Sequence, residues 1–496
     1  MQDKNFVLLF AILFASAFAL RLFLIDVKPV HHDEGVNGYF VSQILTFRWN
    51  DYDECVKQGV NSVLCSILNS NSWRYDAENY HGPLPFYFMA ASVVLFGENI
   101  VALRLVPVLF GILIGLIVLL FRKHLGNAGM LVACFLALFS PSLFYYSLSA
   151  IHEIFFAFFA FGALAFLVSF AENSNKKHLY AGVAMLAGLF TTKEGSFLVG
   201  PAIVAIALVL LFLKFIEKRE KPSVLQSAKT FLICALIFSA IFIVLFSSFF
   251  ANFQGVYDAF KSPFIWAQTM TGETGHAKHP LYYLEILIFS DLVILVLGVL
   301  GIAAALIKKN TSMVAIAAFF LLFIIGASVP KYKVPWGIIT AVPLLAVLAG
   351  YFVEETSKKV KTSAFYFVLA LMLTFVFWQA LWLSSVKCES QDNKLAYVHT
   401  TFEAKHIVEK IEALSKEKYV SVAVIMKQSS WPLPWQLKRF TVSYLSADNF
   451  GAIDISAYDV ALVESTYAQN LIGTENFEKE RFALRPGTSM VAFFKK

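Results

Sequence analysis

Charged residues are scarce in this chain. Only 15% of its 496 residues are Asp, Glu, Lys or Arg, whereas 58% are hydrophobic and 16% are aromatic. Ordinary globular domains carry about 25% charged residues. A water-soluble chain cannot bury so much apolar surface, which excludes a cytosolic enzyme, a disordered scaffold and a nucleic-acid-binding domain. The composition therefore indicates a membrane protein, in which the placement of Lys and Arg matters more than the net charge of +6.

Several motifs of soluble catalysis are also absent. The sequence has no Walker motif, no GxGxxG after a strand and no HExxH, so nucleotide hydrolysis and zinc proteolysis have no support. Its five cysteines include no CxxC pair. Cys134 and Cys234 lie in apolar runs and are interpreted as packing residues. Cys55 and Cys65 share one polar loop and form a disulfide only if that loop faces an oxidising compartment.

Long hydrophobic runs are abundant. A bilayer core of about 30 Å requires roughly 20 apolar residues per helix. Eleven runs qualify: 6–25, 102–121, 128–147, 151–171, 179–193, 196–213, 231–250, 284–307, 312–329, 335–353 and 364–385. No small-residue cleavage site follows the first run, so we interpret it as a membrane span and not as a signal peptide. The run from Pro83 to Phe96 is too short to span and indicates an interfacial helix.

The positive-inside rule predicts the sidedness. With eleven spans and a cytoplasmic N-terminus, the Lys/Arg clusters all fall in cytoplasmic connections: Arg122-Lys123, Lys176-Lys177, Lys214 to Lys229, Lys308-Lys309 and Lys358 to Lys361. If 83–96 also crossed, every cluster would lie outside. We therefore expect an α-helical polytopic protein of the cell membrane with an external C-terminus.

The predicted domains are a transmembrane domain, 1–386, with a long external loop at 26–101, and a small external α/β domain, 387–496. In the second domain Phe402 to Ser415 has helical spacing, and Tyr419 to Ile425 and Asp459 to Val463 have the pattern of strands. The segment Ser430-Trp431-Pro432-Leu433-Pro434-Trp435 is either an interfacial aromatic anchor or a lip over a substrate entrance.

Polar residues suited to chemistry gather in the segments expected on the outer face. His31-His32-Asp33-Glu34 follows the first span, where the two acids either cap a helix or perform catalysis. His81 precedes a Gly-Pro turn and is either a loop residue or a metal ligand. Arg104 begins the second span, where it either reaches toward headgroups or holds a phosphate.

Further polar residues lie at the outer ends of other spans. They are His152-Glu153, Lys193-Glu194 and Lys331-Tyr332-Lys333, with Glu285 and Asp291 in the eighth span. Ionisable groups at membrane depth are costly and usually functional. His276 and His279 could meet His81 around a divalent metal ion. Their convergence on one face predicts a site for an amphiphilic, phosphorylated substrate.

The order of these motifs resembles that of the GT-C membrane glycosyltransferases, the superfamily of protein O-mannosyltransferases and the lipid A aminoarabinose transferase. The resemblance rests on Asp33-Glu34, His81-Gly82-Pro83-Leu84, Arg104-Leu105-Val106-Pro107 and Ser140-Pro141 to Tyr145-Tyr146. It covers nearly the whole chain. Thr192-Lys193-Glu194, Lys333-Val334-Pro335-Trp336 and the Trp431–Trp435 segment look like the archaeal flippase-activity-associated family, which is mannosyltransferase-like.

This resemblance implies a polyprenyl- or dolichyl-phosphate sugar donor on the external face and no nucleotide. The acceptor would be a protein, a glycan or a lipid, and transfer would invert the sugar. Asp33, with Glu34 beside it, aligns with the catalytic carboxylate, which would act as the base. Arg104 aligns with the functional arginine, and Lys193 or Lys333 would add cations for the donor phosphate.

The resemblance also suggests a metal set and leaves one acid unassigned. His81 falls where the aminoarabinose transferase has a carboxylate metal ligand, and His276 or His279 falls near its ligand histidine. Glu153 and Glu194 are the other acids of the predicted site. Related chains often have an Arg-rich turn ending in Asp where this chain has 147–153, so the role of Glu153 stays open.

One alternative function remains. The same cavity would serve a non-catalytic protein that binds a lipid-linked glycan or assists its flipping. A solute transporter is disfavoured because the polar groups crowd one face and do not line a path across the membrane.

Overall fold

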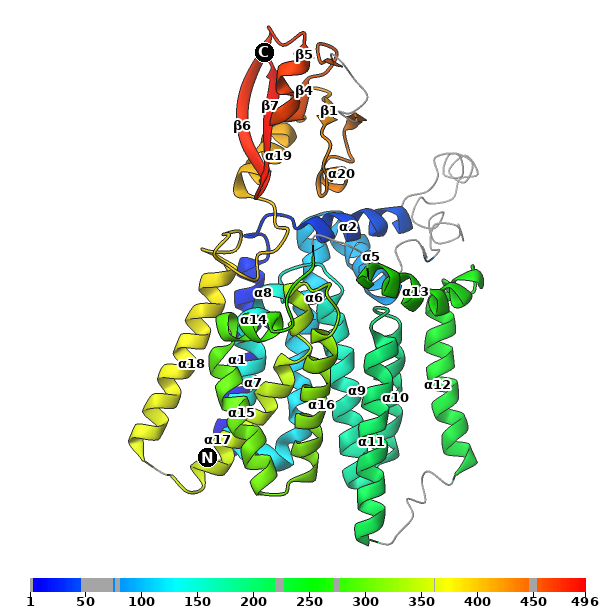
Figure 1. Ribbon diagram of the computed structural model, residues 1–496, viewed down its shortest axis with the longest axis vertical. Helices are drawn as coiled ribbons and strands as arrows, with labels where there is room; N and C mark the ends of the chain where they lie inside the picture. The colour runs from blue at the N-terminus through cyan, green and yellow to red at the C-terminus, as the bar shows by residue number, and fades with distance from the viewer. Residues whose placement is uncertain are drawn as a thin grey trace. The chain divides into compact units, whose positions relative to one another are not determined.

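The computed structural model describes residues 3–45, 75, 81–218, 227–271, 276–360, 362–445 and 453–496. Contacts divide the chain into two compact units, coloured along the chain in Figure 1. The first contains Met1–Ile25 and Gln43–Val386, and the second contains Asp26–Ser42 and Lys387–Lys496. The predicted division at 386/387 had assigned Asp26–Ser42 to the membrane domain. The predicted Cys55–Cys65 disulfide lies outside the described residues.

The first unit is helical, and Figure 1 shows its long helices running side by side. Its helices are α1 (Asp3–Leu24), α5 (Leu84–Phe96), α6 (Ile100–Ile117), α7 (Arg122–Phe139), α8 (Pro141–Ser147), α9 (Glu153–Asn173), α10 (Lys176–Phe190), α11 (Ser196–Lys218), α12 (Ala228–Phe246), α13 (Gln254–Thr271), α14 (Tyr282–Ser290), α15 (Leu292–Ile307), α16 (Thr311–Ser328), α17 (Val342–Ser357) and α18 (Ser363–Ser384). Short 3-10 turns lie at Val118–Phe121 and Pro335–Ile338. Each of the eleven predicted spans coincides with one or two of these helices, and the predicted interfacial helix is α5.

By length and composition, seven helices of the described chain can cross a membrane, or eight if one bent pair counts as a span. The number of candidate spans is smaller than the eleven predicted from the sequence for physical reasons. The run Ile100–Phe139 counts once, although Gly126 breaks it with φ 55°. Helices α10 and α17 have only 15 and 16 residues. The expected straight span 284–307 is instead bent by 110° between α14 and α15.

Glycines bring α17 close to its neighbours. A Cβ on Gly129 of α7 would lie 2.3 Å from the carbonyl oxygen of Gly350 in α17, and a Cβ on Gly301 of α15 would lie 2.0 Å from that of Leu348. Small residues let helix backbones approach within a membrane, where packing replaces the hydrophobic effect. The sequence therefore builds α7, α17 and α15 into one tight layer.

Three of the five basic clusters meet at one end of the first unit. Lys123, Lys214 and Lys309 line a single polar pocket of ≈ 330 Å³. In the same pocket the carboxylate of Glu172 accepts a hydrogen bond from His124 Nε2 at 2.6 Å. Clusters that are far apart in sequence thus share one end of the helices, as the positive-inside argument requires.

The second unit is a small α/β fold. Its five-stranded sheet has the order β2-β1-β4-β7-β6. The strands are β1 (Ser421–Ile425), β2 (Thr441–Leu445), β4 (Val460–Glu464), β6 (Phe477–Arg485) and β7 (Thr488–Lys495), and β3 (Ile453–Asp454) pairs with β5 (Leu471–Ile472) apart from them. Strand β1 is parallel to β2 and β4, whereas β7 is antiparallel to β4 and β6. Helix α19 (Phe402–Leu414) packs its buried side on this sheet. The predicted helix and both predicted strands are confirmed.

The Trp-Pro segment packs on α2 (His32–Leu45), the helix that begins in the Asp-Glu motif. A Cβ on Gly38 would lie 2.6 Å from the indole of Trp435, and a Cβ on Gly35 would lie 2.4 Å from Pro432. Trp435 is buried. It is therefore a packing residue of the second unit and not a free aromatic anchor.

Candidate functional site

The turn after His81 is fastened to the turn between α10 and α11. The backbone N–H of Gly82 donates to the carbonyl of Thr192, and that of Leu84 donates to Thr191, both at 3.0 Å. A Cβ on Gly82 would lie only 2.2 Å from the Thr191 carbonyl oxygen. Glycine is required here because the two backbones touch.

Replacing Gly82 with Ala should separate these two turns. The new methyl group must displace backbone, so we expect a loss of stability of roughly 1–3 kcal/mol and disturbed positions of His81 and Glu194. Thermal melting of the purified protein measures this loss. Gly326→Ala is the matched control, because no atom lies within 4 Å of its added Cβ. Equal melting temperatures for the two variants would contradict the contact.

His81, which is partly exposed, pairs with the buried Glu194. Its Nδ1 lies 2.9 Å from Oε2 of the carboxylate. Burial alone would raise the pKa of Glu194, but the charge and hydrogen bond of His81, with the charge of Lys193, lower it. The ring centroid of His152 lies 4.6 Å from that of His81. Burial, followed by the charges of His81 and Lys193, lowers the pKa of His152 well below its usual value.

The neighbouring residues form a second pair. Nζ of Lys193 lies 2.6 Å from Oε1 of Glu153. Burial alone would lower the pKa of Lys193, but the carboxylates of Glu153 and Glu194 outweigh burial and raise it. The ammonium group is therefore charged throughout the physiological range. The dipeptides His152-Glu153 and Lys193-Glu194 are therefore joined directly by the Lys193–Glu153 pair, and His152 and Glu194 both contact the ring of His81.

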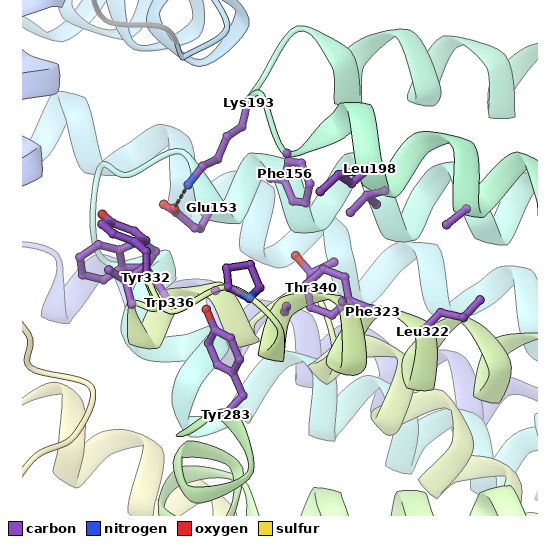
Figure 2. Close-up of a pocket in the computed structure, with 18 of the residues that line it drawn as sticks. Glu153, Phe156, Lys193, Leu198, Tyr283, Leu322, Phe323, Tyr332, Trp336 and Thr340 are labelled. Atoms are coloured by element: carbon purple, nitrogen blue, oxygen red, sulfur yellow. Dashed lines mark hydrogen bonds and ion pairs between the residues drawn. The ribbon is translucent and has the colours of Figure 1, made fainter. Parts of the chain in front are cut away.

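The Lys193–Glu153 pair forms the polar end of a pocket of ≈ 330 Å³. Figure 2 shows Lys193 reaching Glu153 at one end, with Phe156, Leu198 and Leu322 farther along. The other lining residues come mostly from α11, α16 and the segment before α17, and are Gly195, Val199, Ala202, Trp266, Tyr283, Phe319, Phe323, Gly326, Ala327, Pro330, Tyr332, Val334, Trp336, Gly337 and Thr340. A charged end and a long apolar wall suit an amphiphilic molecule with an anionic head.

The segment that precedes α17 contributes every second residue from Tyr332 to Trp336 to the wall of the pocket. Tyr332, Val334 and Trp336 line the pocket, whereas Lys333 is not part of its lining. Nζ of Lys333 instead donates to the carbonyls of Lys278, at 3.3 Å, and of Pro330. This predicted phosphate ligand therefore has its ammonium group on backbone oxygens. Extended backbone points successive side chains to opposite sides, which accounts for the difference.

Arg104 is completely buried near the N-terminal end of α6, in its second turn. One of its guanidinium nitrogens, Nη1, donates to the carbonyl of Ile25 at 2.9 Å. It is not part of the pocket lining either. The two predicted roles for this residue were reaching toward headgroups and holding a phosphate, and complete burial disfavours the first.

Two histidines of the predicted metal set, His276 and His279, contact other side chains in this structure. His276 stacks on Tyr332 with ring centroids 4.9 Å apart, and His279 lies 3.3 Å from the carboxylate of Glu285. Among the residues described here, no three His, Cys, Asp or Glu side chains form a group that could hold a metal ion.

Asp33 and Glu34 belong to the second unit. Glu34 is buried, and its Oε2 accepts the backbone N–H of His31 at 2.9 Å, so it has the predicted capping role. Asp33 is half-buried in the first turn of α2. Only its backbone N–H is engaged, with His31 Nδ1 at 3.0 Å. Its carboxylate makes no hydrogen bond within the described ranges of the chain.

Several residues of the pocket were not predicted. Trp266, Tyr283, Phe319 and Phe323 lie in apolar or amphipathic helices, where an aromatic residue that lines a cavity has the same pattern as one that packs in a core. Tyr332 was named only as part of a Lys-Tyr-Lys turn. His152 was named without its contact with His81, which no spacing in the sequence indicates.

Comparisons with known proteins agree with this architecture. Residues 80–250 match the family model of dolichyl-phosphate-mannose-protein mannosyltransferase. No curated protein matches the sequence. Among solved structures, ArnT from Cupriavidus metallidurans bound to undecaprenyl phosphate has a TM-score of 0.60 at 14% identity, covering 99% of this chain and 98% of that chain. The apo state of ArnT has a TM-score of 0.62 at 13% identity, with the same coverage.

A third similar structure is the Archaeoglobus fulgidus oligosaccharyltransferase tethered to an acceptor peptide. Its TM-score is 0.53 at 12% identity, covering 92% of this chain and 69% of that chain. The chain has the GT-C fold. Five of the site residues predicted from the sequence lie inside the segment that matches the family model, namely His81, Arg104, Glu153, Lys193 and Glu194. The narrower resemblance to the flippase-activity-associated family stays a prediction.

Proposed function

We propose that this GT-C protein transfers a sugar from a polyprenyl-phosphate carrier to an acceptor on the external face of the membrane. The observation that carries the proposal is the pocket with the Lys193–Glu153 pair at one end and apolar walls beyond it. A polyprenyl phosphate has the same two parts, an anionic head and a long apolar chain. ArnT, which has the same fold, has been solved with undecaprenyl phosphate bound. This supports a lipid phosphate as the ligand.

The proposed reaction is a direct displacement. An acceptor hydroxyl oxygen attacks the anomeric carbon, the bond from that carbon to the phosphate oxygen breaks, and the sugar is inverted. The hydroxyl proton passes to the carboxylate of Asp33, which acts as general base. The lipid phosphate leaves with the bonding electron pair, and a fixed ammonium group such as Lys193 stabilises its growing negative charge.

The support for these roles differs. Lys193 is supported by its place in the pocket and by the carboxylates that keep it charged. The role of Asp33 as general base is supported by the resemblance. Its carboxylate also makes no hydrogen bond in the described part of the chain. Arg104 is proposed as a second phosphate ligand from the resemblance alone. Glu153 holds the ammonium group of Lys193 in place.

The proposal is tested by turnover. Purified full-length protein in lipid nanodiscs is given dolichyl-phosphate mannose or dolichyl-phosphate glucose and a membrane extract as the acceptor source. We expect release of free dolichyl phosphate, measured by mass spectrometry, that depends on the protein and is strongly reduced in the Asp33→Asn variant. Tight binding of the lipid without any release would contradict an enzyme.

Lipid binding without release would support the alternative function, the handling of a lipid-linked glycan without catalysis. A protein that binds or helps flip a lipid-linked glycan needs the same charged and apolar pocket but no base. The Lys193–Glu153 pair is compatible with either function, because a carboxylate-paired ammonium group can hold a phosphate without assisting its departure.

A further inference from the structure

Two buried polar atoms beside His81 have no hydrogen-bond partner in the part of the chain that the structure describes. They are Nε2 of His152 and Oε1 of Glu194. Each of these two residues is only 3% exposed. Buried polar groups in folded proteins are nearly always hydrogen-bonded, to the protein or to a molecule bound there. The two atoms therefore mark a place that a polar group from outside the chain can occupy.

The ring of His81 brings these two side chains together. The other carboxylate oxygen of Glu194, Oε2, lies 2.9 Å from Nδ1 of His81, and the ring of His152 packs against that of His81 at a centroid distance of 4.6 Å and a tilt of 42°. The ring of Phe86 covers His152 at a centroid distance of 4.8 Å. Because His152 is held between two rings, the direction of its Nε2 is fixed.

The charges of the cluster select the kind of group that fits. Glu194 is an anion whose Oε1 can only accept a hydrogen bond, and neutral His152 either donates or accepts one. A phosphate would be repelled by the carboxylate. A hydroxyl group can donate to Oε1 and complete a second bond with the imidazole. The cluster is therefore suited to an alcohol and not to an anion.

We propose that His152 and Glu194 form a subsite for a hydroxyl group of the sugar carried by the lipid donor. The inference rests on the proposed function and deepens it. Each subsite residue is adjacent in sequence to a residue at the polar end of the pocket, His152 to Glu153 and Glu194 to Lys193. Neither His152 nor Glu194 is part of the pocket lining itself, so the sugar of a donor whose phosphate is at Lys193 would meet the subsite beyond the Lys193–Glu153 pair. The subsite would then read the position of one hydroxyl.

Lipid binding with and without the sugar tests the subsite. Full-length protein in nanodiscs is titrated with dolichyl phosphate, dolichyl-phosphate mannose and dolichyl-phosphate glucose. We expect wild type to bind at least one sugar-bearing lipid more tightly than the bare phosphate. Glu194→Gln, which loses the anionic acceptor, should weaken binding of that lipid roughly tenfold. Its affinity for dolichyl phosphate should stay within about twofold of wild type.

His152→Phe is the second variant, because phenylalanine keeps the ring between His81 and Phe86 but has no nitrogen. It should show the same selective loss, about fivefold, and it carries the test if Glu194→Gln does not fold. Glu172→Gln is the matched control. Glu172 also pairs with a histidine, His124, but at the opposite end of α9, so it should leave the affinity for every lipid unchanged.

The outcomes separate the subsite from the proposed function. Dolichyl phosphate that binds wild type no more weakly than either sugar-bearing lipid would overturn the subsite alone. So would equal losses for all lipids in the subsite variants, since this would show that the two atoms merely bind an ordered water. If wild type binds none of the lipids, the proposed lipid donor is wrong, and the inference is overturned with it.

Discussion

Asp33→Asn should lower the rate of sugar transfer by about 10²–10⁴-fold, the usual cost of losing a general base. Asparagine has the size of aspartate and is an equally good residue at a helix N-terminus, but it cannot accept the proton of the attacking hydroxyl. The Asp33 carboxylate makes no hydrogen bond in the described ranges of the chain, so folding should be unaffected. The measurement is the initial rate of dolichyl phosphate release, with donor affinity determined separately.

Glu34→Gln is the control for this prediction. The carboxylate of Glu34 accepts the backbone N–H of His31 at 2.9 Å, and a glutamine amide oxygen can accept the same bond. The variant removes the neighbouring charge and leaves the proposed base, so it should retain most of the transfer rate. Wild-type turnover in Asp33→Asn would show that the base has been assigned wrongly and would favour the lipid-handling function.

The sequence predicted the helices of this fold because hydrophobic length is the strongest signal that a membrane chain has. It predicted a straight eighth span, and the structure bends there by 110°. The bend lies at Asp291, whose two carboxylate oxygens accept the hydroxyls of Ser140, at 2.6 Å, and Ser290, at 2.7 Å. The sequence shows Asp291 as an acid in an apolar run, but Ser140, one of its two partners, is far away along the chain. A single sequence does not show which distant residue satisfies such a group.

The same reason limited prediction of the site. The sequence placed Lys193, Glu153, Glu194 and His81 in one predicted region, because charged residues at span ends are rare and conspicuous. It did not show how they pair, since each pair joins segments far apart along the chain. Lys333 was chosen for its charge alone. Lys333 lies in an extended segment, where successive side chains point to opposite sides. Its side chain therefore points away from the side on which Tyr332 and Val334 line the pocket.

Lys193→Met should weaken binding of dolichyl phosphate by roughly 10–100-fold, the value of a hydrogen bond to a charged group. It should also destabilise the protein, because the carboxylate of Glu153 is then left in a mostly buried place without its cation. Removing one partner of a buried pair costs about 3–5 kcal/mol, and we expect about 3 kcal/mol because both side chains keep some exposure. Thermal melting and lipid titration measure the two effects on the same sample.

The double variant Lys193→Met/Glu153→Gln separates the effect on binding from the effect on stability. A neutral glutamine needs no cation, so most of the lost stability should return, as it often does when a buried ion pair is replaced as a whole. Lipid binding should stay weak, because the ammonium group is still missing. Lys261→Met serves as a stability control, since the Lys261 side chain is half exposed and its pair with Asp258 is worth at most about 1 kcal/mol. If the double variant recovers wild-type affinity for dolichyl phosphate, Lys193 supports the fold of the pocket and another cation holds the phosphate.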